Sequence, residues 1–404
     1  MRIALATVGT TGDVAPFVLL AQRLVSRGHD VTAISWPLHR AALSLPGVRV
    51  EVAGPHADPG RIAAVAAEAA GRPPLDQVAV LRDFHLADGE NHYRRLSALL
   101  PGHDLLVVHG IHVLAHAAVL DAGLPFATAV FDPVLLPTRS APPPGLPPLG
   151  PINPVAWWML DRLLARSARP VDAILSRAGS AQRGLPLFRA RSERLHLLAC
   201  SPAIVRVPPD LPAGTRVTGG WLDDGPVPPL SPEVETFLAD GAAPIVIAFG
   251  SMAGASDAAV DDAVRTILEG GRRVVVQGGV ATDVASPNLL RIGAVDHRAL
   301  FPRAAVVIHH GGSGTTHAVC AAGVPSLVIP HVGDQPYWAD RLRRLGVAPD
   351  PQPVRSLRAD RLADGTLATA GDRSMQERAQ RLAAELAAED GLGVAVAGLE
   401  GLTI

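Results

Sequence analysis

The sequence predicts an α/β protein with two doubly wound domains that face a cleft. Short apolar runs, typical of buried parallel strands, alternate with stretches of helical periodicity in both halves of the chain. The length of 404 residues suits two domains of about 200 residues each. The proline-dense stretch 223–233 has the composition of an interdomain linker. We therefore expect an N-terminal domain over 1–218 and a C-terminal domain over 219–404, whose last helix could pack back on the N-terminal domain.

The N-terminal half begins with an apolar run that predicts a first strand at 2–8. Apolar residues at helical spacing follow this strand, and Gly28 is placed to end the helix. A further helix is expected at 112–122, and nine prolines between 133 and 154 exclude regular structure from that segment. The remaining strands are expected at 30–35, 48–53, 104–109 and 126–130.

The C-terminal half repeats this alternation of strands and helices. Ligands of doubly wound sheets bind beyond the carboxyl ends of the strands, so the turns that follow the strands are where chemistry is expected. Apolar runs predict strands at 244–250, 273–276, 304–309 and 325–329. Helical stretches are expected at 257–270, 314–322 and 334–346.

The composition excludes several classes of function. A net charge of −2 and a pI of about 6.7 give no electrostatic case for a nucleic-acid partner. The chain contains no lysine, which excludes Schiff-base chemistry, a pyridoxal phosphate anchor and a Walker-type lysine. Because there are two cysteines and no run of 18 apolar residues, we expect a cytoplasmic protein with at most peripheral membrane contact.

The sequence HHGGSGTT at 309–316 directly follows an expected strand and opens an expected helix. Gly312 and Gly314 allow the backbone to approach a ligand closely, and Thr315 adds a hydroxyl at the helix N-terminus. Since that end of a helix carries about half a positive charge, the turn can bind a diphosphate without lysine or metal. His310 could add a hydrogen-bond donor or a full charge. The alternative is a tight strand-to-helix turn that binds nothing.

Two further turns in the C-terminal half carry polar side chains. Asp334 and Gln335, in GDQPYW at 333–338, begin a helix after a strand. A carboxylate beside an amide suits vicinal sugar hydroxyls, which need both acceptors and donors. In FGSM at 249–252, the hydroxyl of Ser251 could contact a phosphate oxygen. The alternative role for Asp334 is to cap its helix.

The turn GTTGDVAP at 9–16 follows the first strand and contains a candidate general base, Asp13. A carboxylate there could take the proton from an attacking hydroxyl, and burial would be expected to raise its pKa for that role. Thr10 of the same turn is a further candidate contact of the diphosphate. Capping the following helix is the alternative role for Asp13.

Together these motifs resemble the family-one nucleotide-sugar glycosyltransferases, particularly the bacterial natural-product and glycopeptide-antibiotic enzymes and the sterol glucosyltransferases. The similarity runs nearly end to end and is densest at 294–347. It implies the GT-B fold with two Rossmann-like domains, and inverting transfer that needs neither a metal nor another cofactor. The implied reaction moves a hexose or deoxyhexose from a UDP- or dTDP-sugar to a hydroxyl of a small apolar natural product, as in antibiotic biosynthesis or tailoring.

The resemblance also implies a role for each candidate residue. Asp13 would be the general base, and Asp334 with Gln335 would bind the sugar. The nucleoside would lie near Val295 and His297. The diphosphate would be held by Thr10, Ser251, His310, Gly312, Gly314 and Thr315.

Two positions depart from the family pattern. Many relatives have a tryptophan that stacks on the nucleobase where this chain has Ala294, which leaves the choice between uridine and thymidine donors open. Sterol enzymes commonly have arginine where this chain has Thr11, which weakens the similarity to that branch.

Four histidines lie outside these motifs. His109 and His112 follow an expected strand and are candidates for the acceptor pocket. For His85 and His116 we expect positions on a helix surface or in the core.

Several alternatives share these motifs. A sterol or lipid glucosyltransferase and a nucleotide-sugar 2-epimerase would use the same fold and donor site, and an inactive sugar-nucleotide sensor is the non-enzymatic alternative. The apolar, proline-rich segment 133–158, which ends in two tryptophans, favours an enzyme with an aglycone pocket. A nicotinamide-dependent dehydrogenase is excluded because neither glycine-rich turn completes G-x-G-x-x-G. Both a monomer and a dimer are compatible with the sequence.

Overall fold

The contacts within the chain divide it into two compact units. The first unit holds Met1–Arg61, Val78–Leu222 and Asp390–Ile404, and the second holds Ile62–Gln77 and Asp223–Glu389. The segment Ile62–Gln77 groups with the second unit because Ala66 lies in the apolar core there. The computed structural model describes residues 1–70, 72–134, 136–143, 146, 149–250, 257–278 and 282–402.

The first unit is built on a parallel sheet with the strand order β3-β2-β1-β4-β5-β6-β7. Ile3 of β1 lies beside Val31 on one side and beside Leu105 on the other. The strand order reverses between β1 and β4, so the turn that follows β1 lies at a topological switch point, where such sheets bind ligands. The strands are β1 (Arg2–Ala6), β2 (Asp30–Ser35), β3 (Val48–Val52), β4 (Leu105–His109), β5 (Phe126–Val130), β6 (His196–Leu198) and β7 (Thr215–Val217).

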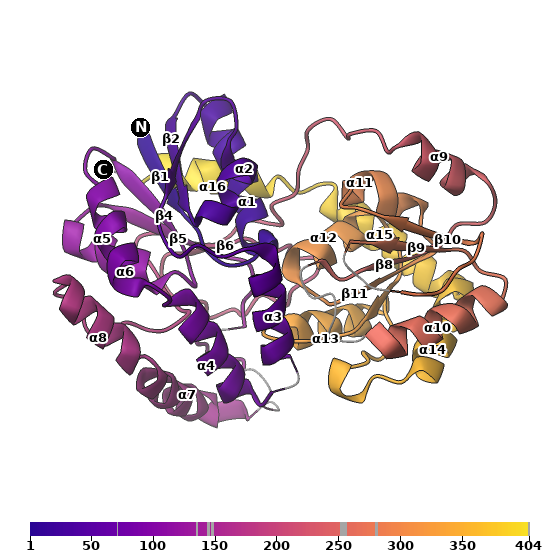
Figure 1. Cartoon of the computed structure of the whole chain (residues 1–404). Helices are drawn as coiled ribbons and strands as arrows, with labels where there is room; N and C mark the ends of the chain where they lie inside the picture. The colour runs from indigo at the N-terminus through magenta and orange to yellow at the C-terminus, as the bar shows by residue number, and fades with distance from the viewer. Residues whose placement is uncertain are drawn as a thin grey trace. The chain divides into compact units, whose positions relative to one another are not determined.

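Helices cover both faces of this sheet (Figure 1). Side chains alternate along β1, so Ile3 and Leu5 join the core beneath α1 and α16, whereas Ala4 and Ala6 join the core beneath α5, α6 and α8. The helices of this unit are α1 (Thr11–Ser26), α2 (Arg40–Leu43), α5 (Gly89–Leu99), α6 (Val113–Ala122), α7 (Asn153–Ser167), α8 (Arg169–Ala178) and α16 (Gly391–Glu400). In addition, α3 (Pro59–Ala69) begins in this unit and α4 (Pro74–His85) ends in it.

The last helix, α16, packs on α1 in the first unit. Leu392, Val396 and Leu399 enter the same core as α1. Glu400 contacts Arg27 and His29, each at 3.1 Å. The chain therefore returns to the first unit after it completes the second.

The second unit is built on a smaller parallel sheet with the order β10-β9-β8-β11-β12. Along β8, Ile245 and Ile247 face the core formed with α10 and α14, whereas Val246 and Ala248 face α9 and α12. The strands are β8 (Ile245–Ala248), β9 (Val274–Gln277), β10 (Leu289–Ile292), β11 (Val306–His309) and β12 (Ser326–Val328). The helices include α9 (Pro232–Ala239), α10 (Asp257–Glu269), α11 (His297–Leu300), α12 (Ser313–Ala321), α13 (Gln335–Leu345), α14 (Ala359–Gly371) and α15 (Arg373–Leu386).

The predicted α/β class with two doubly wound parallel sheets is confirmed. The strands β6, β7 and β10 were not predicted; β7 and β10 are partly exposed and lack the apolar run of a buried strand. The expectation that regular structure is absent from 133–154 is wrong at the end of this segment, where Gly150–Ile152 forms a 3₁₀ turn and α7 begins at Asn153. Pro151 and Pro154 lie at the starts of these two helices, where proline is tolerated. Among the helices of the described residues, none has both the length and the apolar character needed to cross a membrane.

Candidate functional site

Asp13 is the third residue of α1, in the turn at the switch point of the first sheet. Its Oδ2 accepts hydrogen bonds from the backbone N and the Oγ1 of Thr10, at 2.7 and 2.9 Å. Gly9 has φ +111°, and a Cβ there would lie 2.4 Å from Oδ2. No residue that the structure describes donates to the other oxygen, Oδ1. The half-buried carboxylate thus caps its helix through Oδ2, and Oδ1 has no hydrogen-bond donor among the described residues.

Short polar contacts hold this turn in place. The Oγ1 of Thr7 donates to the carbonyl oxygen of Asp13 at 3.2 Å and lies 3.4 Å from Nδ1 of His109. The Nε2 of His39 lies 3.0 Å from the carbonyl oxygen of Gly9, so this ring nitrogen donates. The position of Asp13 is therefore set by buried neighbours on both sides of the turn.

The two candidate acceptor histidines are both buried in the first unit. His109 packs between the rings of Phe17 and Phe131, with ring centres 5.5 and 5.2 Å away. Burial lowers the pKa of His109 to about 4, and the nearby charge of Asp13 opposes that shift only in part. His112 caps α6, and burial lowers its pKa well below the usual value. Their place in an acceptor pocket stays a prediction.

His85, which we expected on a helix surface or in the core, lies within electrostatic range of Asp13. Its ring contacts the rings of Trp36 and Phe188, with centres 5.6 Å away in each case. Nδ1 donates to the carbonyl oxygen of Leu81 at 2.8 Å, which leaves Nε2 with the lone pair. Nε2 is buried and has no partner among the described residues, so His85 is a candidate acceptor-side contact that the sequence pattern did not show. Burial lowers its pKa, which keeps the ring neutral at pH 7.

In the second unit, the predicted diphosphate turn connects β11 to α12. The buried Nδ1 of His309 accepts from the backbone N of Gly311 at 3.2 Å, which fixes the start of the turn. Gly311 has φ +88°, and a Cβ there would lie 2.8 Å from Val328. A Cβ on Gly312 would lie 2.5 Å from Nε2 of His310. The ring of His310 therefore lies directly against the backbone at the N-terminus of α12.

His310 is neutral in this setting. Burial lowers its pKa to about 3, and repulsion from His331 and His297 adds to this shift. The ring can offer a hydrogen bond, and it would gain charge only if a bound anion raised its pKa. Gly314 and Thr315 lie in the first turn of α12, where the backbone N–H groups have no partner within the helix. A Cβ on Gly314 would meet nothing within 4 Å, so open space adjoins this turn.

The two predicted sugar-binding residues differ in how they are held. Oε1 of Gln335 accepts from the backbone N of His331 at 2.7 Å and of Val332 at 3.1 Å, so this buried amide shapes the preceding turn. Asp334 is half-buried, and its Oδ2 accepts from Nε1 of the fully buried Trp338 at 2.6 Å. Gln335 also reaches the diphosphate turn, because a Cβ on Gly311 would lie 3.1 Å from its carbonyl oxygen.

The predicted nucleoside contacts lie in the turn before α11. The carbonyl oxygen of Val295 accepts from Nε2 of Gln277 at 3.1 Å. His297 stacks on Phe301, with ring centres 4.1 Å apart and an angle of 15° between the rings. Burial lowers the pKa of His297, which keeps this ring neutral. The turn thus holds a neutral ring stacked on Phe301 and a fixed backbone carbonyl, and its role in binding the nucleoside stays a prediction.

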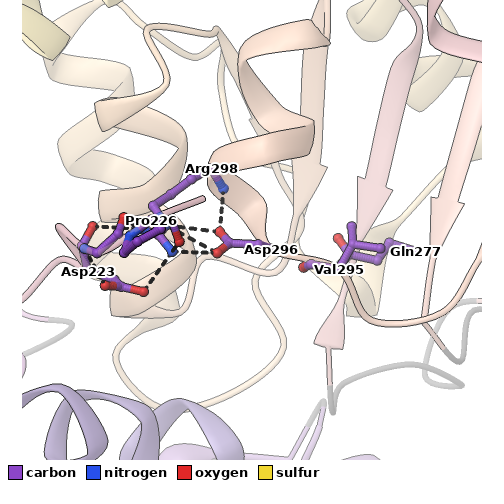
Figure 2. Close-up of polar contacts among 7 residues, drawn as sticks. Asp223, Pro226, Gln277, Val295, Asp296 and Arg298 are labelled. Atoms are coloured by element: carbon purple, nitrogen blue, oxygen red, sulfur yellow. Dashed lines mark hydrogen bonds and ion pairs between the residues drawn. The ribbon is translucent and has the colours of Figure 1, made fainter. Parts of the chain in front are cut away.

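Arg298 holds this turn in position, and the sequence pattern did not indicate it (Figure 2). Its guanidinium contacts Oδ2 of Asp296 at 2.6 Å and Oδ2 of Asp223 at 2.7 Å. It also donates to the carbonyl oxygens of Asp223 and Gly225, at 3.1 and 2.8 Å. The linker residues after 222 are thereby tied to the turn that carries His297.

Ser251 lies outside the described residues. Among the residues that the structure does describe, no cluster of three or more histidine, cysteine or acidic side chains could hold a metal ion.

Comparison with known proteins decides the family. Residues 272–397, which include His297, His310 and Asp334, match the family described as erythromycin biosynthesis protein CIII-like, C-terminal domain. Over 409 residues the chain is 32% identical to O-mycaminosyltylonolide 6-deoxyallosyltransferase of Streptomyces fradiae, with 97% of this chain and 95% of that protein covered. The chain belongs to the family-one natural-product glycosyltransferases.

A further relative agrees with this family, and a solved structure agrees with the fold. The glycosyltransferase is 33% identical over 367 residues to vancomycin aglycone glucosyltransferase of Amycolatopsis orientalis, with 86% of this chain and 85% of that protein covered. The crystal structure of the glycosyltransferase VinC in complex with dTDP is similar in fold, with a TM-score of 0.67 at 19% sequence identity and 99% of each chain covered. The predicted GT-B fold and the predicted family are confirmed.

Proposed function

We propose that this glycosyltransferase transfers a hexose or deoxyhexose, with inversion, from a UDP- or dTDP-sugar to a hydroxyl of a small apolar natural product. The diphosphate turn of the second unit is the observation that carries the proposal. There the ring of His310 lies against Gly312 at the start of α12, and open space adjoins Gly314 in the first turn of the same helix. Relatives that act as 6-deoxyallosyl- and glucosyltransferases support a hexose or deoxyhexose, and the dTDP complex of VinC supports the donor class.

In this proposal the second unit binds the donor. The N–H groups in the first turn of α12, which have no partner within the helix, and the ring of His310 contact the diphosphate, whose negative charge grows as the sugar leaves. Thr10 and Ser251 remain proposed contacts of the same diphosphate, together with Gly312, Gly314 and Thr315. Val295 and His297 bind the nucleoside, and Asp334 with the amide nitrogen of Gln335 binds the sugar.

The first unit supplies the general base. Oδ1 of Asp13, which has no donor among the described residues, takes the proton of the acceptor hydroxyl. The hydroxyl oxygen then attacks C1 of the sugar on the side opposite the nucleoside diphosphate, and the bond from C1 to that group breaks. An α-linked donor therefore gives a β-glycoside. We further propose that the neutral Nε2 of His85, which is buried and has no partner among the described residues, accepts a hydrogen bond from the acceptor.

We propose that no metal or other cofactor takes part. The diphosphate turn combines a helix N-terminus with a histidine, and no Asp-x-Asp triplet precedes it. Turnover measured with excess EDTA is expected to equal turnover without it. A strict requirement for magnesium or manganese would contradict this assignment. We also propose a cytoplasmic location, the compartment expected for a chain with only two cysteines.

Calorimetric titration tests the proposed division between sugar and diphosphate contacts. Asp334→Asn is expected to weaken the binding of dTDP-glucose and UDP-glucose by about 10- to 150-fold, since a charge-assisted hydrogen bond is worth about 1.5–3 kcal/mol. The affinity for free dTDP and UDP should not change. His310→Ala is expected to weaken the binding of all four ligands, because all four carry the diphosphate. Asparagine is the better replacement for Asp334, since alanine would leave the buried N–H of Trp338 without its acceptor.

The control variant for this titration is Trp338→Phe, which removes the N–H and keeps most of the ring packing. Its loss of sugar-nucleotide affinity should be smaller than that of Asp334→Asn, because the carboxylate remains. If Asp334→Asn weakened free dTDP as much as dTDP-glucose, Asp334 would support the fold of the turn and would not bind the sugar.

A further inference from the structure

Helix α7 presents an apolar strip to solvent in the first unit. We name Ile152, Val155, Trp158, Met159 and Leu163 the α7 strip; their exposed fractions are 57, 56, 56, 55 and 39%. These five make up half of the ten large apolar side chains that are exposed in the described residues. Single exposed apolar side chains are ordinary, but a contiguous set marks a binding surface.

The opposite face of α7 is already fully engaged. Asn153, Trp157 and Leu164 are buried on that face. The side-chain amide of Asn153 donates to the carbonyl oxygen of Arg139, and Nε1 of Trp157 donates to that of Ala141, both at 2.9 Å. These contacts fix the rotation of the helix, so the α7 strip faces outward in the folded protein.

The charged side chains that share the face of the α7 strip are arginines. Arg162 and Arg166 are exposed and follow Trp158 and Met159 at helical spacing. The guanidinium of Arg162 lies 4.9 Å from the ring centre of Trp158. The one carboxylate of α7, Asp161, is paired with Arg189. The face therefore combines apolar contact surface with two arginines that form no ion pair with any carboxylate of the described residues.

We propose that the α7 strip rests on an anionic lipid surface. A helix with this pattern lies in the plane of the membrane interface, with its apolar side chains at the acyl boundary. Tryptophan favours that depth, and arginine stems can lie along apolar surface while their charges reach the head groups. Anionic lipids supply the negative charge that the face itself lacks.

A second copy of the chain fits this face less well. A two-fold contact would bring the arginines of both copies together with no free carboxylate of α7 between them. A lipid surface needs no shape complementary to a single convex helix, whereas a stable protein interface usually buries about 800 Å² on each partner. The proposal goes beyond the transfer reaction, and its test needs no sugar donor or acceptor.

Co-sedimentation of the full chain with vesicles tests the proposal. Binding is expected to vesicles that mix phosphatidylcholine with phosphatidylglycerol, and to weaken as salt is added. The double variant Trp158→Ser, Met159→Ser should bind these vesicles at least about tenfold more weakly. The double variant Arg162→Gln, Arg166→Gln should bind the mixed vesicles about 25-fold more weakly, which is about fivefold for each charge removed. Its affinity for pure phosphatidylcholine vesicles should change little.

Val227→Ser is the matched control, because it replaces another exposed apolar residue, 51% exposed, in the second unit. It should bind like the wild type. Thermal melting should be the same for all variants, since every replaced side chain is exposed. Failure of the wild type to bind mixed vesicles would overturn the proposal, as would binding that the α7 strip variants leave unchanged. A dimer in sedimentation equilibrium that Trp158→Ser, Met159→Ser dissolves, with no vesicle binding, would assign the strip to self-association instead.

Discussion

Replacement of Asp13 by asparagine is expected to reduce transfer by about 100- to 10,000-fold, the usual contribution of a general base. Asparagine keeps an oxygen that can accept from the backbone N and Oγ1 of Thr10, so the start of α1 should remain intact. The variant loses the carboxylate oxygen that would take the proton. Steady-state turnover should therefore fall while calorimetric affinity for dTDP stays near that of the wild type.

A second capping aspartate provides the control for this experiment. Asp372 caps α15 by accepting from the backbone N of Met375 at 3.0 Å, and it has no part in the proposed site. Asp372→Asn should retain full turnover. If Asp13→Asn also kept more than about a tenth of wild-type turnover, Asp13 would be a helix cap and the base would have to be another group.

Mild acid is expected to unfold the protein. Seven buried histidines are neutral in the folded state, whereas each would bind a proton below about pH 6.5 in the unfolded chain. The contribution of these histidines to the free energy of unfolding is therefore fully present above pH 6.5. It is lost as the pH falls toward their folded-state pKa values, at up to about 1.4 kcal/mol per pH unit for each histidine. The pKa is lowered to about 3 for His92, His309 and His310, and to about 4 for His109, His116, His196 and His317.

Summed over these seven histidines, the free energy of unfolding that is lost over one pH unit is comparable with the whole free energy of unfolding of a typical domain, about 5–15 kcal/mol. Circular dichroism should show a melting temperature that falls steeply below pH 6.5 and a cooperative loss of structure near pH 5. His116→Phe removes one buried ring whose Nδ1 has no partner, and it should make this decline less steep. A melting temperature that stayed constant between pH 7.5 and pH 5 would contradict the neutral buried state of these histidines.

The parts of the fold that follow from local patterns could be predicted from the sequence. Runs of apolar residues marked the buried strands β1 and β4. Gly9 and Gly311 marked turns whose positive φ values other residues rarely adopt. The short strands β6 and β7 form because neighbouring strands supply their hydrogen bonds, and no local pattern reveals that.

The contacts of the candidate site depended on tertiary structure and could not be predicted. Nothing in the sequence indicates that Trp338 donates to Asp334, or that Oε1 of Gln335 is used by the backbone of the preceding turn. The electrostatic interaction of His85 with Asp13 joins two residues that are distant in the sequence, so no local pattern could reveal it. Residue types at motif spacing therefore indicated where a ligand binds, whereas the roles of single atoms required the structure.

The most direct test of the proposed reaction is mass spectrometry of mixtures that contain the enzyme, UDP- or dTDP-glucose, and a panel of polyketide, peptide and steroid alcohols. We predict that one acceptor gains the mass of a single sugar residue and that an equal amount of free nucleoside diphosphate appears, with the product β-linked by NMR. Conversion of the sugar nucleotide to an isomer without a glycoside would contradict the account and indicate a 2-epimerase. Tight donor binding with no conversion across the whole panel would also contradict it and indicate a sensor.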